Sequence, residues 1–248
     1  YFYPAEKEKL QKDISLMLQA ARSEKSFKKI FGIVSPHAGY TYSGKTAAFV
    51  YNLLKNKSYK KVIVISPSHA EYFSGISIYD GDAYETPLGI VEIDQNLVDK
   101  LIENSKTIFR GSQGHRKEHA LEVQIPFLQT VLNNFKIVPI VMGDQSKMFV
   151  DELAERISKI VDDETVVVAS SDMSHFYSAE EADRLDSVVE KRINDFDFDQ
   201  LLLDLDDHEC EACGGGPIVA MMKAASLKSI TNSLVINRSD SGDITGDK

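Results

Sequence analysis

Three histidines follow three separate apolar runs of the sequence, each within a few residues of the end of its run. His37 comes after IFGIVS, His69 after KVIVIS, and His175 after TVVVAS. If these runs are parallel strands, the three imidazoles lie at one rim of the sheet, where open α/β folds bind their ligands. Imidazoles act as acid–base groups and as ligands of zinc, copper and iron. The pattern therefore favours a metal or acid–base site at that rim.

A cysteine motif, Cys210-Glu-Ala-Cys213-Gly-Gly-Gly-Pro, adds a second kind of metal ligand. A thioredoxin-like redox motif would follow a strand, whereas an acidic stretch, DLDDHE, precedes these cysteines. Cys213 stands just before a predicted helix, where the helix dipole and free N–H groups favour a thiolate. One thiolate and two imidazoles leave coordination positions open, as in catalytic metal sites. The alternative is a glycine-rich turn with two small buried cysteines, which remains our interpretation of Cys210.

The segment His115-Arg-Lys-Glu-His119 matches H-x-x-E-H, an inverted zinc-protease motif. Gly114 precedes it, so we expect the helix to begin near Lys117 and to leave His115 outside, which disfavours a metalloprotease. Instead, His119 and Glu122 are three residues apart, on one face of the expected helix, and are predicted to support the rim site. A zinc deaminase is also excluded. Its H-x-E and P-C-x-x-C motifs lie on separate helices, whereas in this chain the similar residues run together in one short segment.

The elements that position these residues are predicted from apolar patterning. The strand candidates are continuous apolar runs, which are typical of a parallel sheet buried on both faces, and lie at 30–35, 61–66, 136–142, 165–170 and 233–237. Helices are predicted near 5–22, 44–56, 95–104, 118–133, 147–161, 179–194 and 216–227. A capping box from Ser178 to Glu181 and the Gly216-Pro217 pair mark two helix starts. The alternation predicts an α/β fold with a mostly parallel central sheet and helices on both faces.

Residues 72–94 depart from this alternation. They follow a period of two and carry the turn signals DGD and PLG, which predicts a β-hairpin inserted after the second strand. No repeat, linker or low-complexity stretch divides the 248 residues, so we expect a single domain over 1–248.

Composition excludes several classes of protein. The excess of 38 acidic over 28 basic residues gives a net charge of −10, which argues against binding to nucleic acid or to anionic membranes. No apolar run approaches the roughly 20 residues that span a bilayer, and the first residues do not have the pattern of a signal peptide. Two cysteines cannot form a disulfide scaffold, so we expect a cytoplasmic location. The absence of an initiator Met leads us to expect a trimmed chain.

Seven motifs, in order, resemble the Memo family, which includes the proteins called AmmeMemoRadiSam system protein B. They are SPHAGYTYSGKTAA (35–48), SPSHAEYFSGISIY (66–79), TPLGIVEID (86–94), EHALEVQIPFLQ (118–129), SSDMSH (170–175), ACGGGPI (212–218) and SGDITGD (241–247). The resemblance covers nearly the whole chain. It implies a fold like that of class III (LigB-type) extradiol dioxygenases, which are non-haem iron enzymes with two histidines and one carboxylate. It also implies a functional link to radical SAM and Ammecr-like proteins, and an apolar strand beyond the last motif that this chain lacks.

Carried over by position, the resemblance implies a metal held by His37, His69 and Cys213, with the thiolate in place of the dioxygenase carboxylate. One divalent metal is implied, with iron first because of the fold and copper or zinc as alternatives because a thiolate is a soft ligand. The thiolate also argues against the aromatic ring cleavage that the dioxygenases perform. His175 resembles an additional pocket histidine of the family, with Asp172 beside it.

Two functional hypotheses follow. The first is a metal-dependent oxidoreductase of small molecules, in which His175 acts as acid or base and is oriented by Asp172. The second is a non-catalytic module whose His/Cys pocket recognises a peptide or an anionic, phosphate-bearing ligand, as animal Memo proteins are linked to phosphotyrosine peptides. The net charge of −10 disfavours the second hypothesis, and a purely structural role for the histidines is a third.

The other residues expected at the site are His119 and Glu122 as catalytic helpers, and Tyr40, Tyr42 and Ser68 as substrate-binding residues.

Overall fold

The strands of the described residues form two sheets. The computed structural model describes residues 2–21, 25–240 and 242–246. The strands are β1 (Gly32–Ser35), β2 (Lys61–Pro67), β3 (Ile76–Tyr79), β4 (Ala83–Thr86), β5 (Gly89–Glu92), β6 (Ile108–Gly111), β7 (Lys136–Met142) and β8 (Thr165–Ser170). Six of them form a central sheet in the order β1-β8-β2-β7-β3-β6, and β4 pairs with β5 in a separate two-stranded sheet.

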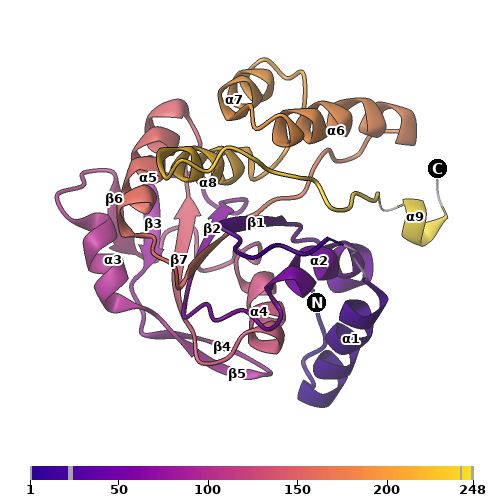
Figure 1. Cartoon of the computed structure of the whole chain (residues 1–248), viewed down its shortest axis with the longest axis horizontal. Helices are drawn as coiled ribbons and strands as arrows, with labels where there is room; N and C mark the ends of the chain where they lie inside the picture. Colours follow the sequence, from indigo (N-terminus) through magenta and orange to yellow (C-terminus); the bar gives the residue numbers. More distant parts are fainter. Residues whose placement is uncertain (1, 22–24, 241, 247–248) are drawn as a thin grey trace.

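Helices cover both faces of the central sheet (Figure 1). The α-helices of the described residues are α1 (Lys7–Ala20), α2 (Tyr40–Leu54), α3 (Gln95–Ile102), α4 (Ile125–Val131), α5 (Lys147–Ile160), α6 (Ala179–Asn194), α7 (Phe198–Asp206), α8 (Gly215–Leu227) and α9 (Gly242–Thr245), of which α9 lies away from the sheet (Figure 1). Helix α2 contacts α1 and α4, whereas α5 contacts α3 and α8, and α6 and α7 continue from the α8 side. The chain is thus a single α/β domain.

The strand order explains why the two helix layers form and where a ligand site can lie. Strands β1, β8, β2 and β7 are parallel to one another, whereas β3, beside β7, and its parallel partner β6 run in the opposite direction. The connection from β1 to β2 passes over β8, while the connection from β7 to β8 passes over β2 in the opposite direction. Right-handed crossovers in opposite directions put α2 and α5 on opposite faces. The carboxyl ends of β1, β8 and β2 therefore meet where the order reverses, which is the usual ligand edge of such sheets.

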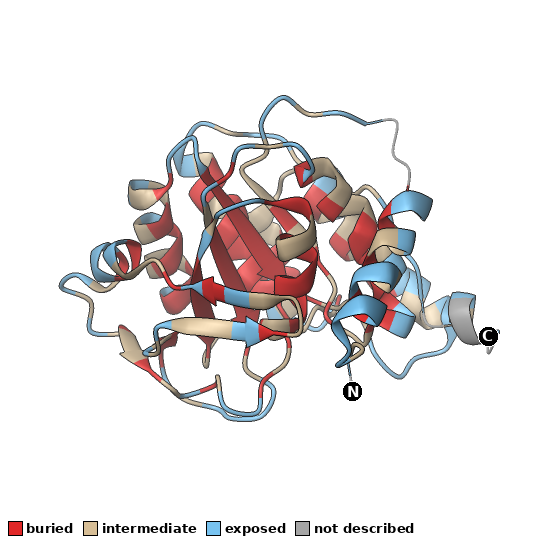
Figure 2. Ribbon diagram, turned by 90° about the horizontal axis from the view of Figure 1, so that it is seen from below, coloured by how far each residue is buried: buried red, intermediate tan, exposed pale blue. Residues whose placement is uncertain are grey.

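The core lies in the central strands (Figure 2). Every residue of β8 is buried, as are the last six residues of both β2 and β7. Their valines and isoleucines pack against helices on both faces, which explains why these strands are continuously apolar. The prediction of a mostly parallel, doubly covered sheet is confirmed.

The segment after β2 is only partly the predicted hairpin. Strands β4 and β5 form an antiparallel hairpin, as expected. Strand β3, however, joins the central sheet beside β7, and β6, which was not predicted, pairs with it in parallel. Helix α7 was also not predicted, although Asp197 caps it by accepting the N–H of Gln200 at 3.2 Å. The capping box at the start of α6 is confirmed, because the Ser178 side chain accepts the N–H of Glu181.

The predicted strand at 233–237 is wrong. This segment has no regular secondary structure and lies against the end of α6. The Val235 N–H donates to Asn194 Oδ1 at 2.8 Å, and the Ser233 hydroxyl donates to the carbonyl of Ile193. Its backbone is thus bound by a helix end rather than by a strand. Ser241 and Asp247 of the last motif, and Arg22 of the first expected helix, lie outside the described residues.

The predicted helix at 118–133 is wrong in its first part. A short 3₁₀ turn occupies Glu122–Gln124, and α4 begins only at Ile125, with Pro126 in its first turn. The Glu118 carboxylate accepts the N–H groups of His119 and Ala120 at 2.9 Å each, so the chain forms a tight turn there instead of a helix.

None of the helices among the described residues is long and apolar enough to cross a bilayer.

Candidate metal centre

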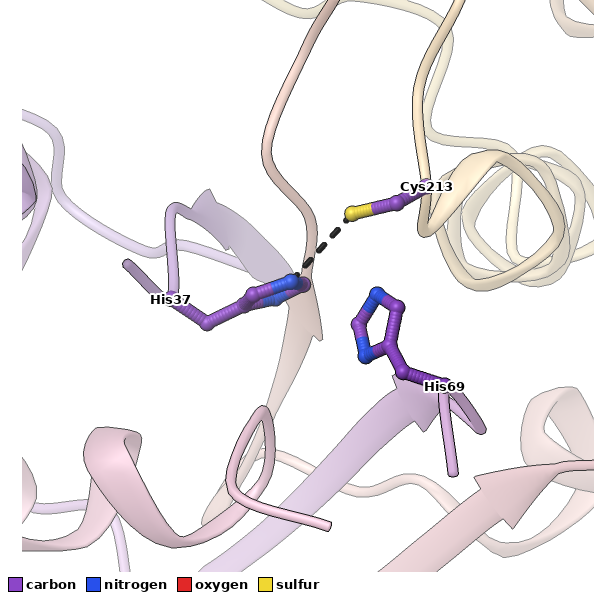
Figure 3. A group of neighbouring side chains, drawn as sticks. All are labelled: His37, His69 and Cys213. Atoms are coloured by element: carbon purple, nitrogen blue, oxygen red, sulfur yellow. Dashed lines mark hydrogen bonds between the residues drawn. The ribbon is translucent and has the colours of Figure 1, made fainter. Parts of the chain in front are cut away.

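Three chain segments bring a possible ligand to the carboxyl edge of the sheet. His37 lies two residues beyond β1, His69 lies two residues beyond β2, and Cys213 lies two residues before α8. One ligand atom of each residue lies within 4.8 Å of the other two. Figure 3 shows the three side chains converging from these separate segments. The structure thus brings together the three residues that the sequence predicted as ligands.

A buried serine fixes which nitrogen of His37 faces the cysteine. The Ser170 hydroxyl donates to the carbonyl of Ala120 at 2.6 Å and accepts from Gln124 Nε2 at 2.8 Å. Its remaining contact is with His37 Nδ1 at 2.9 Å. Because the hydroxyl has only one hydrogen to donate, His37 Nδ1 must carry the proton in this contact. Nε2 is then the nitrogen that faces Cys213 Sγ, which lies 3.2 Å away, and it can share a proton with the sulfur or bind a metal.

The amide of Gln124 is itself oriented by its neighbours. Its Oε1 accepts the hydroxyl of the buried Tyr51 at 2.6 Å, and its Nε2 also donates to the carbonyl of Pro36 at 3.1 Å. These contacts assign Nε2 as the atom that faces Ser170. A buried hydrogen-bond chain from Tyr51 to His37 therefore holds the imidazole in one tautomer.

A buried carboxylate holds His69. Both oxygens of Glu118 lie 3.2 Å from His69 Nδ1, and Oε2 also accepts the backbone N–H of His69 at 2.5 Å. Burial alone would raise the pKa of Glu118, but hydrogen bonds from His69 and from the N–H of Ala120 outweigh it and lower this pKa to about 2. A carboxylate at Nδ1 leaves Nε2 for a metal, as in carboxylate–histidine–metal arrangements.

The thiol of Cys213 lies in a setting that favours the thiolate. Burial raises its pKa, but the hydrogen bonds with His37 and His69 outweigh burial and lower it to about 6. The backbone N–H of Asp172 also points at Sγ, at 3.2 Å. Metal ligation requires the deprotonated sulfur, so this environment prepares the ligand.

The turn that carries Cys213 is held by Gln145, which follows β7. Gln145 Nε2 donates to the carbonyl of Cys213 at 2.9 Å, and its Oε1 accepts the N–H of Gly216 at 2.8 Å. A Cβ on Gly214 would lie 2.2 Å from the carbonyl oxygen of Ser170, which explains the glycine there. Gln145 thus fixes both ends of the turn that presents the sulfur.

Asp172 and His175 lie beside the three possible ligands. Asp172 Oδ1 accepts the backbone N–H of His37 at 2.7 Å and that of Ala38 at 3.3 Å. Its Oδ2 lies 3.7 Å from Nε2 of the half-exposed His175. Contact with Asp172 raises the pKa of His175. Asp172 therefore positions the His37 loop and also faces His175.

His119 and Glu122 do not share a helical face, because His119 precedes the 3₁₀ turn. The His119 ring lies 6.1 Å from that of His69 and 6.3 Å from that of His37, and the Phe2 ring stacks on it at 3.6 Å. Burial lowers the pKa of His119. Glu122 lines a cavity together with His119 and accepts the hydroxyl of Tyr3.

The three residues expected to bind substrate are placed differently from one another. Tyr40 is buried in the core, where its hydroxyl donates to the carbonyl of Val123 at 2.7 Å, so it does not line the mouth of the site. Tyr42 is half exposed on α2. The Ser68 hydroxyl donates to the carbonyl of Glu71 within its own loop.

The H-x-x-E-H motif does not form a metal site in the part of the chain that the structure describes. His115 Nδ1 lies 3.0 Å from the hydroxyl of Tyr84, and its ring packs against Tyr79. It is therefore separated from the group of His37, His69 and Cys213. Glu118 of this motif supports His69 instead. Cys210 is buried, as expected of an ordinary small residue.

Sequence reasoning missed four supporting residues: Ser170, Gln124, Glu118 and Gln145. Ser170 lies at the end of an expected strand, and Glu118 stands beside a histidine, but neither position identifies its partner. Ser170 and His37 are 133 residues apart, and Glu118 and His69 are 49 apart. Only the fold brings these pairs together.

The donor set fits a transition metal. Two imidazole nitrogens and one thiolate sulfur suit zinc, copper and iron, whereas magnesium and calcium prefer oxygen ligands. Both imidazoles are anchored at Nδ1, so each can offer Nε2 to an ion.

The whole chain has known relatives. Residues 1–248 match the family model described as Memo-like protein. The chain is 37% identical over 248 residues to a MEMO1 family protein of Thermoplasma volcanium, covering 100% of this chain and 91% of the relative. It is 36% identical to a MEMO1 family protein of Aquifex aeolicus and 35% identical to one of Methanococcus maripaludis, covering 99% of this chain and 91% and 92% of those relatives. The chain therefore belongs to the Memo family.

Proposed function

We propose that this Memo-family chain is a metal-dependent oxidoreductase that acts on a small molecule. His37, His69 and Cys213 would hold one divalent metal. The observation that carries the proposal is their convergence within 4.8 Å, together with the anchoring of each imidazole by Ser170 or Glu118. A site built only for packing would not need a fixed tautomer at one histidine and a buried carboxylate at the other.

The donor set and the fold together suggest which metal binds. We propose a fold relationship to the class III extradiol dioxygenases, which places iron first, while the thiolate keeps copper and zinc as alternatives. When bound, iron or copper would supply redox chemistry, and zinc would supply a Lewis acid. Three protein ligands leave positions open for a substrate.

The surrounding residues would handle protons and orientation. His175 is half exposed beside the centre and can exchange a proton with a bound molecule, while Asp172, 3.7 Å away, orients its ring. His119, which faces both ligand histidines, can donate to or accept from a molecule held between the centre and the neighbouring cavity.

Loading with single metals tests this function. Protein purified without oxygen is loaded with Fe(II), Cu(I) or Zn(II), and the oxidation state of bound iron or copper is followed by spectroscopy as air and then ascorbate are added. We expect reversible oxidation and reduction in the wild type and loss of the bound signal in Cys213→Ser. If zinc alone binds, the redox part of the proposal is refuted and only the Lewis-acid role survives.

A second candidate is a metal-free binding module for a phosphate-bearing ligand. It is favoured by the raised pKa values of His69, to about 10, and of His175, which place positive charge at the pocket. The hydrogen bond with Cys213 is the main cause for His69, so most of that charge is balanced by a thiolate. Titration of inorganic phosphate into metal-stripped protein separates the two functions, because tight binding without metal would favour the module.

We further propose a cytoplasmic location, because two free cysteines suit a reducing compartment. A functional link to radical SAM and Ammecr-like proteins is proposed from the family resemblance, and co-purification from native cells tests it. The acidic charge argues against nucleic acid as a partner.

A further inference from the structure

A cavity of about 560 Å³ lies next to the metal centre. Its walls come from three distant segments: Phe2 and Tyr3 near the start of the chain, Glu85 and Thr86 at the end of β4, and His119 and Glu122. The imidazole of His119 lines the cavity on one side and lies 6.1 Å from the His69 ring. The volume suits a small organic molecule, which would reach towards the centre past His119.

The polar groups of this cavity are mostly acceptors. Glu85 and Glu122 contribute two carboxylates, and no Lys or Arg is among the described residues that line the cavity. The hydrogen bond between Tyr3 and Glu122 uses Oε1 of the carboxylate, which leaves Oε2 for a ligand. The Thr86 hydroxyl donates its hydrogen to Gln129, so it can only accept a hydrogen bond from a ligand. Two carboxylates without a lining cation attract a positive charge and repel an anion.

The N-terminal segment adds an aromatic wall at a fixed position. The Phe2 carbonyl accepts the N–H of Tyr40 at 2.8 Å, and the Phe2 ring stacks on His119. Tyr3 packs against Tyr40 with ring centroids 5.4 Å apart. Aromatic faces beside carboxylates favour organic cations, because the ring quadrupole attracts positive charge and the rings cover apolar carbon.

We propose that this cavity binds a small organic cation: a primary ammonium group joined to a flat apolar part. The ammonium group lies between Glu85 and Glu122, and the apolar part packs against Phe2 and Tyr3. The role of this ligand as a substrate rests on the proposed metal function, but its binding does not require a metal.

Binding of 2-phenylethylamine to the full chain stripped of metal tests the proposal. Two probes of similar shape, 2-phenylethanol and phenylacetate, replace the ammonium group with a hydroxyl or a carboxylate. By titration calorimetry we expect the amine to bind at least about tenfold more tightly than the alcohol, since charge-assisted hydrogen bonds are stronger than neutral ones, and phenylacetate to bind most weakly. Equal binding of all three probes, or no binding of the amine, would overturn the proposal.

Four variants locate the charge. Glu122→Gln and Glu85→Gln should each weaken amine binding about tenfold, because each removes one carboxylate charge. Tyr3→Phe keeps both carboxylate charges and should change amine binding less than Glu122→Gln does. Glu180→Gln, on an exposed turn of α6, should leave amine binding unchanged. Should Glu122→Gln fail to fold, Glu85→Gln still decides; unchanged binding in every folded carboxylate variant contradicts the assignment.

Zinc titration of the same variants keeps the two proposals apart. We expect zinc affinity to be unchanged in Glu85→Gln and lost in Cys213→Ser, while Cys213→Ser still binds the amine. If the wild type binds the amine but does not bind zinc, only the metal function is refuted. Zinc binding without amine binding would refute the cavity assignment alone.

Discussion

The substitution Ser170→Ala tests how the fold prepares His37 for a metal. Ser170 is fully buried, and its hydroxyl contacts Ala120, Gln124 and His37 at 2.6, 2.8 and 2.9 Å. Removing it leaves the Ala120 carbonyl and the Nδ1–H group of His37 without this partner, whereas Gln124 keeps its contact with Pro36. Each buried polar group left unpaired costs about 1–3 kcal/mol, so for these two groups we expect the free energy of unfolding to fall by about 2–6 kcal/mol.

The metal affinity should fall as well. Without Ser170, the imidazole of His37 is free to place its proton on either nitrogen and to turn about its side-chain bonds. Loss of such a supporting partner costs about 10- to 100-fold in metal affinity. Competition with a chromophoric chelator measures the zinc affinity, and nitrogen chemical shifts of the His37 ring report the tautomer, which we expect to be protonated at Nδ1 in the wild type.

Ser66→Ala is the matched control. Ser66 is also fully buried, near the end of the neighbouring strand β2, but its hydroxyl has no hydrogen-bond partner among the described residues. The same atom is therefore deleted without loss of a hydrogen bond, and zinc affinity should stay within about twofold of the wild type. If folded Ser170→Ala binds zinc as tightly as Ser66→Ala does, Ser170 does not prepare His37 for a metal.

Two further predictions concern the supports of His69 and Cys213. The pKa of Glu118 is about 2 in the folded chain against an ordinary 4.5, so its contribution to stability is complete above pH 4.5 and is lost as the pH falls towards 2. Glu118→Gln should remove up to about 3 kcal/mol of this pH dependence in urea unfolding of metal-free protein, and an unchanged slope below pH 4.5 would contradict it. Gly214→Ala places a Cβ 2.2 Å from the Ser170 carbonyl and should lower both zinc affinity and melting temperature, while Gly39→Ala, whose nearest neighbour is 3.6 Å away, should be tolerated. Equal melting temperatures of these two variants would show that the turn accommodates a side chain.

Much of the fold could be predicted because its main strands are unambiguous. The runs around β2, β7 and β8 are apolar throughout, so they predict both the strands and their burial on two faces. The positions of His37 and His69 follow from these strands, because each histidine comes directly after a strand end. The residue types suggested that a Cys213 thiolate joins two imidazoles, but only the family resemblance identified His37 and His69 as those two.

The failures have local causes that a pattern does not reveal. The run SLVIN at 233–237 has the composition of a strand, but at the end of α6 the Asn194 side chain accepts the Val235 N–H, and the carbonyl of Ile193 accepts the Ser233 hydroxyl. The periodicity from 118 to 133 suits a helix, but the Glu118 carboxylate takes the N–H groups that would begin it. In both cases a side-chain hydrogen bond competes with regular secondary structure.

The most direct test of the central claim is the metal content of the chain. Protein purified without oxygen from cells grown with iron, copper and zinc is measured by elemental analysis, next to Cys213→Ser and Cys210→Ser prepared in the same way. Cys213 offers one of the three possible ligand atoms, whereas Cys210 is buried outside the group. We expect about one metal ion per chain in the wild type and in Cys210→Ser, and a much lower metal content in Cys213→Ser, whose metal affinity should fall at least about tenfold. Equal metal content in Cys213→Ser, or no metal in the wild type, would contradict this claim.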